Sequence, residues 1–276
     1  MLKARLITAF ALGLPALWLV FESSQKVFWW FLFVIVVLGM WEWSRLSGIK
    51  SLIPRLVGTV FFAAIVMLVD NLNVYTWIET PQVFMFLSFW WLIASFRVVK
   101  YSGAVVALSK PYILFRYLEG MLILLGLMYS LQLLHSQSTG SWLVVILLSL
   151  IWGADSFAYF AGRQWGKKKL LPRVSPGKTW AGVMGGAIGG TAVSACIVFL
   201  HPVLAPHVLW FIPVIAISIA FSVMGDLFES MYKREVDLKD SGHLLPGHGG
   251  MLDRIDSLLA AAPVFVTGLF LVGVMA

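Results

Sequence analysis

Apolar segments long enough to cross a bilayer follow one another along almost the whole chain. A bilayer core about 30 Å thick requires roughly 20 apolar helical residues, and fewer where neighbouring helices or local thinning help. We therefore predict an all-α, polytopic integral membrane protein with about nine transmembrane helices. The predicted spans are residues 6–21, 27–41, 56–69, 83–96, 112–134, 142–161, 180–200, 208–228 and 257–275.

The composition agrees with a chain that is solvated by lipid. Hydrophobic residues make up 60% of the chain and charged residues 12%, whereas soluble domains are about 45–50% apolar and about one quarter charged. We find no soluble domain, linker or short repeat, so residues 1–276 are expected to form a single transmembrane domain. Cys196 is the one cysteine. It excludes a disulfide framework, and we expect a buried thiol in a helix.

The positions of the basic residues predict how the chain is oriented. All 20 Lys and Arg except Lys26 fall in loops on the same side of the predicted spans, and the positive-inside rule makes that side cytoplasmic. The N-terminus is then inside and the C-terminus outside, which requires an odd number of spans. The basic start of the chain is signal-like, but no small-residue cleavage site stands out, so we expect a retained first helix. We attribute the net charge of +7 mainly to this topology, with some contact to anionic lipid headgroups, and expect no nucleic-acid partner.

The two halves of the chain differ in character. Residues 1–140 are interpreted as scaffold helices, in which Glu119 is predicted to be a paired structural carboxylate. Residues 141–276 are interpreted as the catalytic half, with loops expected at 162–179 and 229–256. The span 180–200 is rich in glycine, which favours close helix packing.

A dense polar segment, residues 225–257, contains more than half of the 13 carboxylates of the chain. Asp226 and Glu229 share one face of a helix end, and Asp253 and Asp256 repeat this spacing beside the next span. Four acids next to an apolar core would repel one another unless a cation balances them. Oxygen ligands without a Cys/His set favour Mg²⁺ or Mn²⁺.

The same segment contains cations that can bind phosphate, namely Lys233, Arg234, Lys239 and Arg254. Its glycines let the backbone approach an anion. A metal, cations and an open backbone together predict phosphoryl or nucleotidyl transfer, in which charge stabilisation and positioning do most of the work. The alternative interpretation is a solvated cytoplasmic loop.

The other basic loop, residues 162–179, ends in Gly-Lys-Thr. A P-loop is excluded because Pro172 stands where the first glycine would be required, and we expect no strand before it. Ser175, Lys178 and Thr179 can nevertheless contact a polyphosphate from the same side of the membrane.

The polar segment also resembles the signature sequence of a known enzyme family. Ser230-Met-Tyr-Lys-Arg, Lys239-Asp-Ser-Gly-His and Pro246-Gly-His-Gly-Gly-Met-Leu-Asp-Arg-Ile-Asp256 resemble the signature of the phosphatidate cytidylyltransferases, or CDP-diacylglycerol synthases, most closely the bacterial inner-membrane members. The resemblance extends to residues 153–182, including Asp155, and more loosely to the rest of the chain. Ala181 departs from the acidic or amide residue that many members have there.

This resemblance implies a reaction of CTP with phosphatidic acid that gives CDP-diacylglycerol and pyrophosphate with Mg²⁺, on the cytoplasmic side of an inner membrane, with the C-terminus periplasmic. It implies that Asp226 and Asp253 hold the metal and that Glu229 and Asp256 support them. Lys233, Arg234, Lys239 and Arg254 would neutralise phosphates, and Asp240 or His248 would orient a phosphate or handle a proton. Asp155, Ser175, Lys178 and Thr179 would contact substrate. The acyl chains would lie in a cleft open to lipid. Three points are left open, namely whether Mn²⁺ can replace Mg²⁺, whether an additional monovalent cation binds, and whether the chain forms a homodimer.

Two alternatives from other classes remain. A transporter of an anionic solute would also use intramembrane acids, but it requires polar residues along both halves of a path, and the external side is nearly free of charge. A CDP-alcohol phosphotransferase would carry an Asp-Gly-x-x-Ala-Arg signature, and this chain contains no Asp-Gly.

Overall fold

The computed structural model describes residues 15–72, 80–104, 106, 108–242 and 249–275. Eight helices of this part of the chain are long and apolar enough to cross a membrane. They are α2 (Gln25–Leu46), α3 (Leu52–Asn71), α5 (Pro81–Lys100), α6 (Lys110–Ser136), α7 (Gly140–Trp165), α8 (Trp180–Leu200), α9 (Val208–Glu235) and α10 (Leu252–Leu271), and a short 3₁₀ helix, η1 (Ala205–His207), precedes α9. The prediction of an all-α polytopic membrane protein is confirmed. Of the first predicted span, 6–21, the described residues 15–21 are helical.

The helices of the polar segment are longer than predicted. α9 continues through residues 229–235, which we had assigned to a loop, and α10 begins at Leu252 rather than at residue 257. Lys233 and Arg234 lie in the last turn of α9, and Asp253 lies in the first turn of α10. Both placements are favoured by the helix dipole, so the helices extend past the apolar residues that defined the predicted spans.

A two-stranded antiparallel hairpin connects α7 to α8. Its strands are β1 (Lys169–Leu171) and β2 (Ser175–Thr179). The expectation that no strand precedes Pro172 was wrong, since β1 ends at Leu171. A strand of three residues is too short to show a periodic pattern. Thr179 ends the hairpin and caps α8, since its Oγ1 accepts a hydrogen bond of 3.1 Å from the Gly182 N–H.

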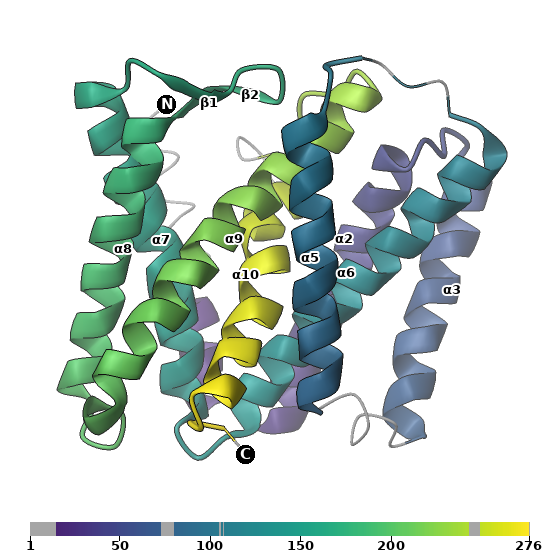
Figure 1. Cartoon of the computed structure of the whole chain (residues 1–276). Helices are drawn as coiled ribbons and strands as arrows, with labels where there is room; N and C mark the ends of the chain where they lie inside the picture. Colours follow the sequence, from purple (N-terminus) through teal and green to yellow (C-terminus); the bar gives the residue numbers. More distant parts are fainter. Residues whose placement is uncertain (1–14, 73–79, 105, 107, 243–248, 276) are drawn as a thin grey trace.

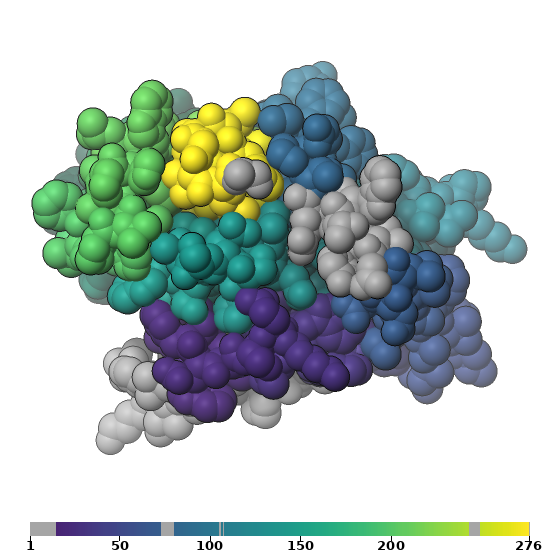
Figure 2. Space-filling model, turned by 90° about the horizontal axis from the view of Figure 1, so that it is seen from below, coloured from purple at the N-terminus to yellow at the C-terminus, as the bar shows by residue number. Residues whose placement is uncertain are grey.

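The connections that carry basic residues lie at one end of the helix bundle. Figure 1 shows the hairpin, the α2–α3 and α5–α6 connections and the segment after α9 together at its upper end. This agrees with the prediction that the basic loops share a side, while the orientation of that side in a membrane stays a prediction. Seen from the opposite end, the yellow end of α10 lies between the green α8–α9 segment and the blue α5 (Figure 2).

Glycines determine how closely the helices of the second half pack. A Cβ on Gly186 would lie 2.7 Å from the Ala154 carbonyl oxygen, and one on Gly190 would lie 2.9 Å from the Leu150 carbonyl oxygen. The close packing predicted for the span 180–200 is therefore confirmed as contact between α7 and α8. Cys196 lies in α8 as expected, but its side chain is exposed on the outer face of the helix. The buried thiol we expected was wrong, because an apolar run in a membrane helix does not distinguish the side that packs from the side that faces lipid.

Candidate active site

Most of the predicted acidic residues meet where α9 crosses α10. A Cβ on Gly225 would lie 2.5 Å from the Asp256 carbonyl oxygen, so the two helices come into backbone contact directly beside Asp226. The charges of Asp226 and Glu229 both act on the Asp256 carboxylate. The structure therefore brings together acids that are about 30 residues apart in the sequence, as the spacing on the two helices predicted.

Lys233 links the two helices. Its Nζ lies 2.9 Å from Glu229 Oε2 on α9 and 2.7 Å from Asp253 Oδ1 on α10. Glu229 is fully buried and Lys233 nearly so. An ion pair buried at this depth holds both carboxylates in defined positions, since breaking it would leave an uncompensated charge.

Asp253 also organises the segment that precedes α10. Its Oδ2 accepts hydrogen bonds from the Gly250 N–H at 2.7 Å and from the Ser241 N–H at 3.2 Å. One carboxylate therefore fixes both flanks of the stretch that contains His248. That histidine lies outside the described residues, so its predicted role stays a prediction.

Glu42, on α2, is a residue of this region that sequence reasoning missed. Its Oε1 accepts a hydrogen bond from Met251 N–H at 3.0 Å, and its Oε2 accepts from Leu252 N–H at 2.8 Å and from Ser241 Oγ at 2.9 Å. The side chain is 2% exposed. Gly242 and Gly250 lie against the same carboxylate and leave no room for a Cβ. A single carboxylate from residues 1–140, which we had interpreted as scaffold, thus caps the start of α10. The sequence signal that could have pointed to Glu42 was an acidic residue inside an apolar run.

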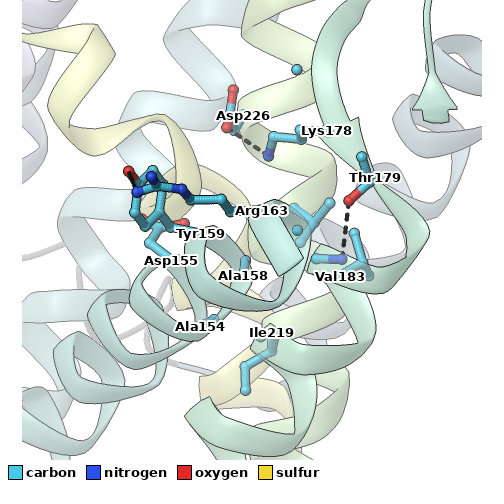
Figure 3. Close-up of a pocket in the computed structure, with 15 residues that line it drawn as sticks. Ala154, Asp155, Ala158, Tyr159, Arg163, Lys178, Thr179, Val183, Ile219 and Asp226 are labelled. Atoms are coloured by element: carbon cyan, nitrogen blue, oxygen red, sulfur yellow. Dashed lines mark hydrogen bonds and ion pairs between the residues drawn. The ribbon is translucent and has the colours of Figure 1, made fainter. Parts of the chain in front are cut away.

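The hairpin supplies the third side of the site. Lys178 Nζ lies 2.6 Å from Asp226 Oδ2, and Figure 3 shows Lys178 reaching from the hairpin to Asp226 on α9. Both residues line a cavity of about 400 Å³ between α7, α8 and α9. Asp155 and Thr179 line it as well, together with Tyr159 and Arg163, which we had not predicted.

Other predicted residues are not part of the described cavity lining. Ser175 pairs with Leu171 in the hairpin and is absent from the described cavity lining. Arg234 is exposed, and its Nε lies 3.5 Å from the Val174 carbonyl oxygen in the hairpin turn. Lys239, Asp240 and Arg254 are exposed. Their roles toward substrate stay predictions.

A second group of buried charges supports the end of α9. Glu119 accepts hydrogen bonds from Arg97 and from the Tyr232 hydroxyl. This confirms that the carboxylate is paired, while its structural role stays a prediction. Arg116 is fully buried, and its Nη1 lies 3.1 Å from Glu235 Oε2. We had interpreted Arg116 as a basic loop residue, but it lies inside α6 and faces α9.

The oxygen donors of the site fit a divalent cation in chemistry, although they are not arranged around a single point. Among the described residues, no group of three or more His, Cys, Asp or Glu side chains is placed to hold a metal ion. Within the same part of the chain, Oε1 of Glu229 is buried without a hydrogen-bond partner. Asp226 and Asp253 are each occupied by a lysine. A metal ion at these acids would therefore require the ammonium groups to move.

Comparisons with known proteins identify the family of this chain. Residues 3–272 match the cytidylyltransferase family. The chain is 38% identical over 277 residues to the phosphatidate cytidylyltransferase of Pseudomonas aeruginosa, which covers 99% of this chain and 98% of that protein. It is 36% identical over 290 residues to the phosphatidate cytidylyltransferase of Haemophilus influenzae, with 96% and 97% covered. These matches confirm the resemblance carried by the polar segment, and the chain belongs to the cytidylyltransferase family of nucleotidyltransferases.

Proposed function

We propose that the chain transfers the cytidylyl group of CTP to phosphatidic acid and gives CDP-diacylglycerol and pyrophosphate in phospholipid biosynthesis. The observation that carries this proposal is the cluster of four carboxylates and two lysines beside the cavity between α7, α8 and α9. A reaction between two phosphate-bearing substrates requires such a concentration of fixed charge. The names of the relatives, each a phosphatidate cytidylyltransferase, support the choice of substrates.

We propose that Asp226 and Asp253 hold Mg²⁺, with Glu229 and Asp256 beside them. Two observations favour a bound cation. Among the described residues, Oε1 of Glu229 is buried and has no hydrogen-bond partner. In addition, the carboxylates of Asp226, Glu229 and Asp256 repel one another. Oxygen donors suit Mg²⁺, which takes its remaining ligands from water and phosphate. When bound, the cation would neutralise charge on the transferring phosphate.

The side chains of the chain itself then have separate tasks. A phosphatidate oxygen forms a bond to the α-phosphorus of CTP while the bond from that phosphorus to the bridging oxygen of pyrophosphate breaks. Lys178 is placed to exchange Asp226 for a phosphate oxygen, because both groups line the cavity. Thr179 keeps Lys178 in position by capping α8. Lys233 holds Glu229 and Asp253 in place and supplies positive charge next to them.

The position of the site supports a substrate that stays in the membrane. The cavity is lined on its inner side by small and apolar side chains from the three helices, namely Ala154, Ala158, Val183, Ile219 and Val223. An acyl chain can lie against such a surface while its phosphate reaches the charged end. We propose that this end faces the cytoplasm of a bacterial inner membrane, since the basic loops lie there.

The test is a transfer assay on purified protein in mixed micelles. α-Labelled CTP, phosphatidic acid and Mg²⁺ are expected to give label in the lipid phase, and EDTA is expected to abolish it. Asp253→Asn should lose this transfer, whereas the matched control Asp70→Asn, at the far end of α3, should retain it. Full transfer by Asp253→Asn at equal protein level would refute the assignment of the site, and no transfer by folded wild-type protein would refute the function.

A further inference from the structure

A second cavity lies on the other side of the end of α9. It has a volume of about 660 Å³ and shares no described lining residue with the cavity at Asp226. Its walls come from the end of α2, the start of α3, the start of α6 and the residues that follow α9. Asp226 and Glu235 are nine residues apart on α9, which corresponds to about 13 Å along the helix.

Three cations line this cavity, namely Arg45, Lys50 and Arg55. Among the described residues, none of them forms an ion pair. Arg45 lies close enough to Arg55 for their charges to repel. Glu235 also lines the cavity, but its carboxylate is already balanced by Arg116 at 3.1 Å. Asp237 lines the cavity as well and forms no ion pair among the described residues, and Glu42 lies near enough to attract Arg55. Three cations against these two acids leave this region with a net positive charge.

Arg55 is fixed in a way that leaves part of its guanidinium available. Its Nη2 donates to the Trp41 carbonyl oxygen at 3.0 Å, and the guanidinium lies 4.1 Å from the centroid of the Trp41 ring. In the described structure, its Nε is buried and has no hydrogen-bond partner. A guanidinium held by stacking, with a donor still unsatisfied, is suited to binding an oxyanion.

The surroundings of the cavity indicate that the anion belongs to a lipid. Exposed apolar side chains flank Arg55 in the sequence at the start of α3, namely Leu52, Ile53, Leu56 and Val57. The cavity wall itself includes Leu108, Ile113 and Val236. A soluble anion makes no use of such a surface, whereas acyl chains would cover it. Basic pockets between membrane helices are suited to anionic lipid headgroups.

We propose that this cavity binds the phosphate group of an anionic phospholipid, separately from the proposed catalytic site. Arg45 and Arg55 hold the phosphate oxygens, Lys50 adds charge at the rim, and the acyl chains lie along the outer face of α3. The ligand would touch the cap of α9, where the Leu238 N–H donates to the Lys233 carbonyl oxygen at 2.8 Å. A lipid bound in the cavity would therefore contact the C-terminal end of α9, the helix that carries Glu229 and Lys233.

The binding experiment uses the full chain, purified in a non-ionic detergent. Native mass spectrometry would count bound lipid during titration with phosphatidylglycerol, which is neither substrate nor product of the proposed reaction. Parallel arms would use phosphatidylcholine, glycerol phosphate and inorganic phosphate. We expect phosphatidylglycerol to bind with a defined stoichiometry and the three other probes to bind at least ten-fold more weakly. Equal or tighter binding of either soluble phosphate would overturn the lipid assignment.

Variants assign the binding to this cavity. Removing the three charges with Arg45→Gln, Lys50→Gln and Arg55→Gln together should weaken binding by more than ten-fold, because each basic residue near the surface contributes about five-fold. The matched control neutralises three basic residues outside the cavity, Lys167, Lys168 and Lys169, and should bind as wild type does.

A second variant keeps the proposal falsifiable if the triple variant fails to fold. Lys50 is exposed and forms no ion pair among the described residues, so Lys50→Glu should fold normally. It should weaken phosphatidylglycerol binding about 25-fold, since it removes one cation and adds one anion. Wild-type affinity in Lys50→Glu, or in a folded triple variant, would overturn the proposal.

Discussion

Replacement of Glu42 by alanine should disturb the start of α10 more than the removal of any exposed acid. The Glu42 carboxylate is the acceptor for two backbone N–H groups, those of Met251 and Leu252, and for the Ser241 hydroxyl. Leu252 is buried and Met251 is half-buried, so in the alanine variant the two N–H groups would lose their acceptor with limited access to water.

The magnitude follows from these hydrogen bonds. A buried donor that loses its acceptor costs about 1–3 kcal/mol, so two such donors give a loss of about 2–6 kcal/mol in the free energy of unfolding. Glu42→Gln retains one carbonyl oxygen and should lose about 1–2 kcal/mol. Because Leu252 directly precedes Asp253, we also expect the transfer rate of the alanine variant to fall at least about ten-fold, as for a misplaced catalytic group.

The assay combines thermal unfolding, hydrogen exchange and transfer in one detergent. Amide exchange should accelerate in residues 249–256 of the Glu42→Ala variant and remain unchanged in α7 and α8, because local opening exposes only the groups that lose protection. The matched control is Glu22→Ala, since Glu22 is exposed. Exchange and unfolding temperature identical to this control would refute the capping role of Glu42.

Three further predictions concern other contacts. Lys178→Met should leave the unfolding temperature within a few degrees of wild type, because a half-exposed ion pair contributes at most about 1 kcal/mol. The same variant should raise the KM for CTP at least about ten-fold. An unchanged KM would contradict the proposed phosphate contact. Arg116→Met should destabilise the protein by about 3–5 kcal/mol in thermal unfolding, since Glu235 would keep a buried charge without its partner, and Arg116→Met with Glu235→Leu should recover most of this loss; equal stability of the two variants would be the contrary result. Gly225→Val should lower the unfolding temperature because a Cβ would lie 2.5 Å from the Asp256 carbonyl oxygen, whereas Gly177→Ala, with open space around its Cβ, should not; a wild-type temperature for Gly225→Val would show that the helices do not cross at this glycine.

The sequence predicted the membrane spans well because their signal is strong. Each apolar run is bounded by charged or turn-forming residues, and the run 180–200 coincides with α8 at both ends. The same signal failed for α9 and α10, where polar residues continue the helix beyond the apolar part. The hairpin at Lys169–Thr179 was missed because strands of three and five residues carry almost no periodicity.

For the site, the sequence indicated which acids gather but not what they contact. The spacing of Asp226, Glu229, Asp253 and Asp256 was sufficient to place them at one helix crossing. The partners are long-range, and no local pattern predicts that Glu42 caps a helix 210 positions away. Arg116 shows the same limit, because a basic residue near a predicted loop has the same sequence signature whether it faces lipid headgroups or a buried acid.

The placement of Lys233 between Glu229 and Asp253 has a consequence for how the protein exists before it meets its substrates. The chain carries its own counter-ions at both ends of the acidic cluster, Lys233 in one case and Lys178 in the other. In the folded state, covalently attached ammonium groups therefore balance part of the acidic charge, unlike in small metal-dependent domains that unfold when their metal is removed. A divalent ion entering this cluster would exchange with an ammonium group rather than add to a bare site. Such an ion would be held only by the difference between its own attraction to the carboxylates and that of the ammonium group, so its binding would be readily reversible.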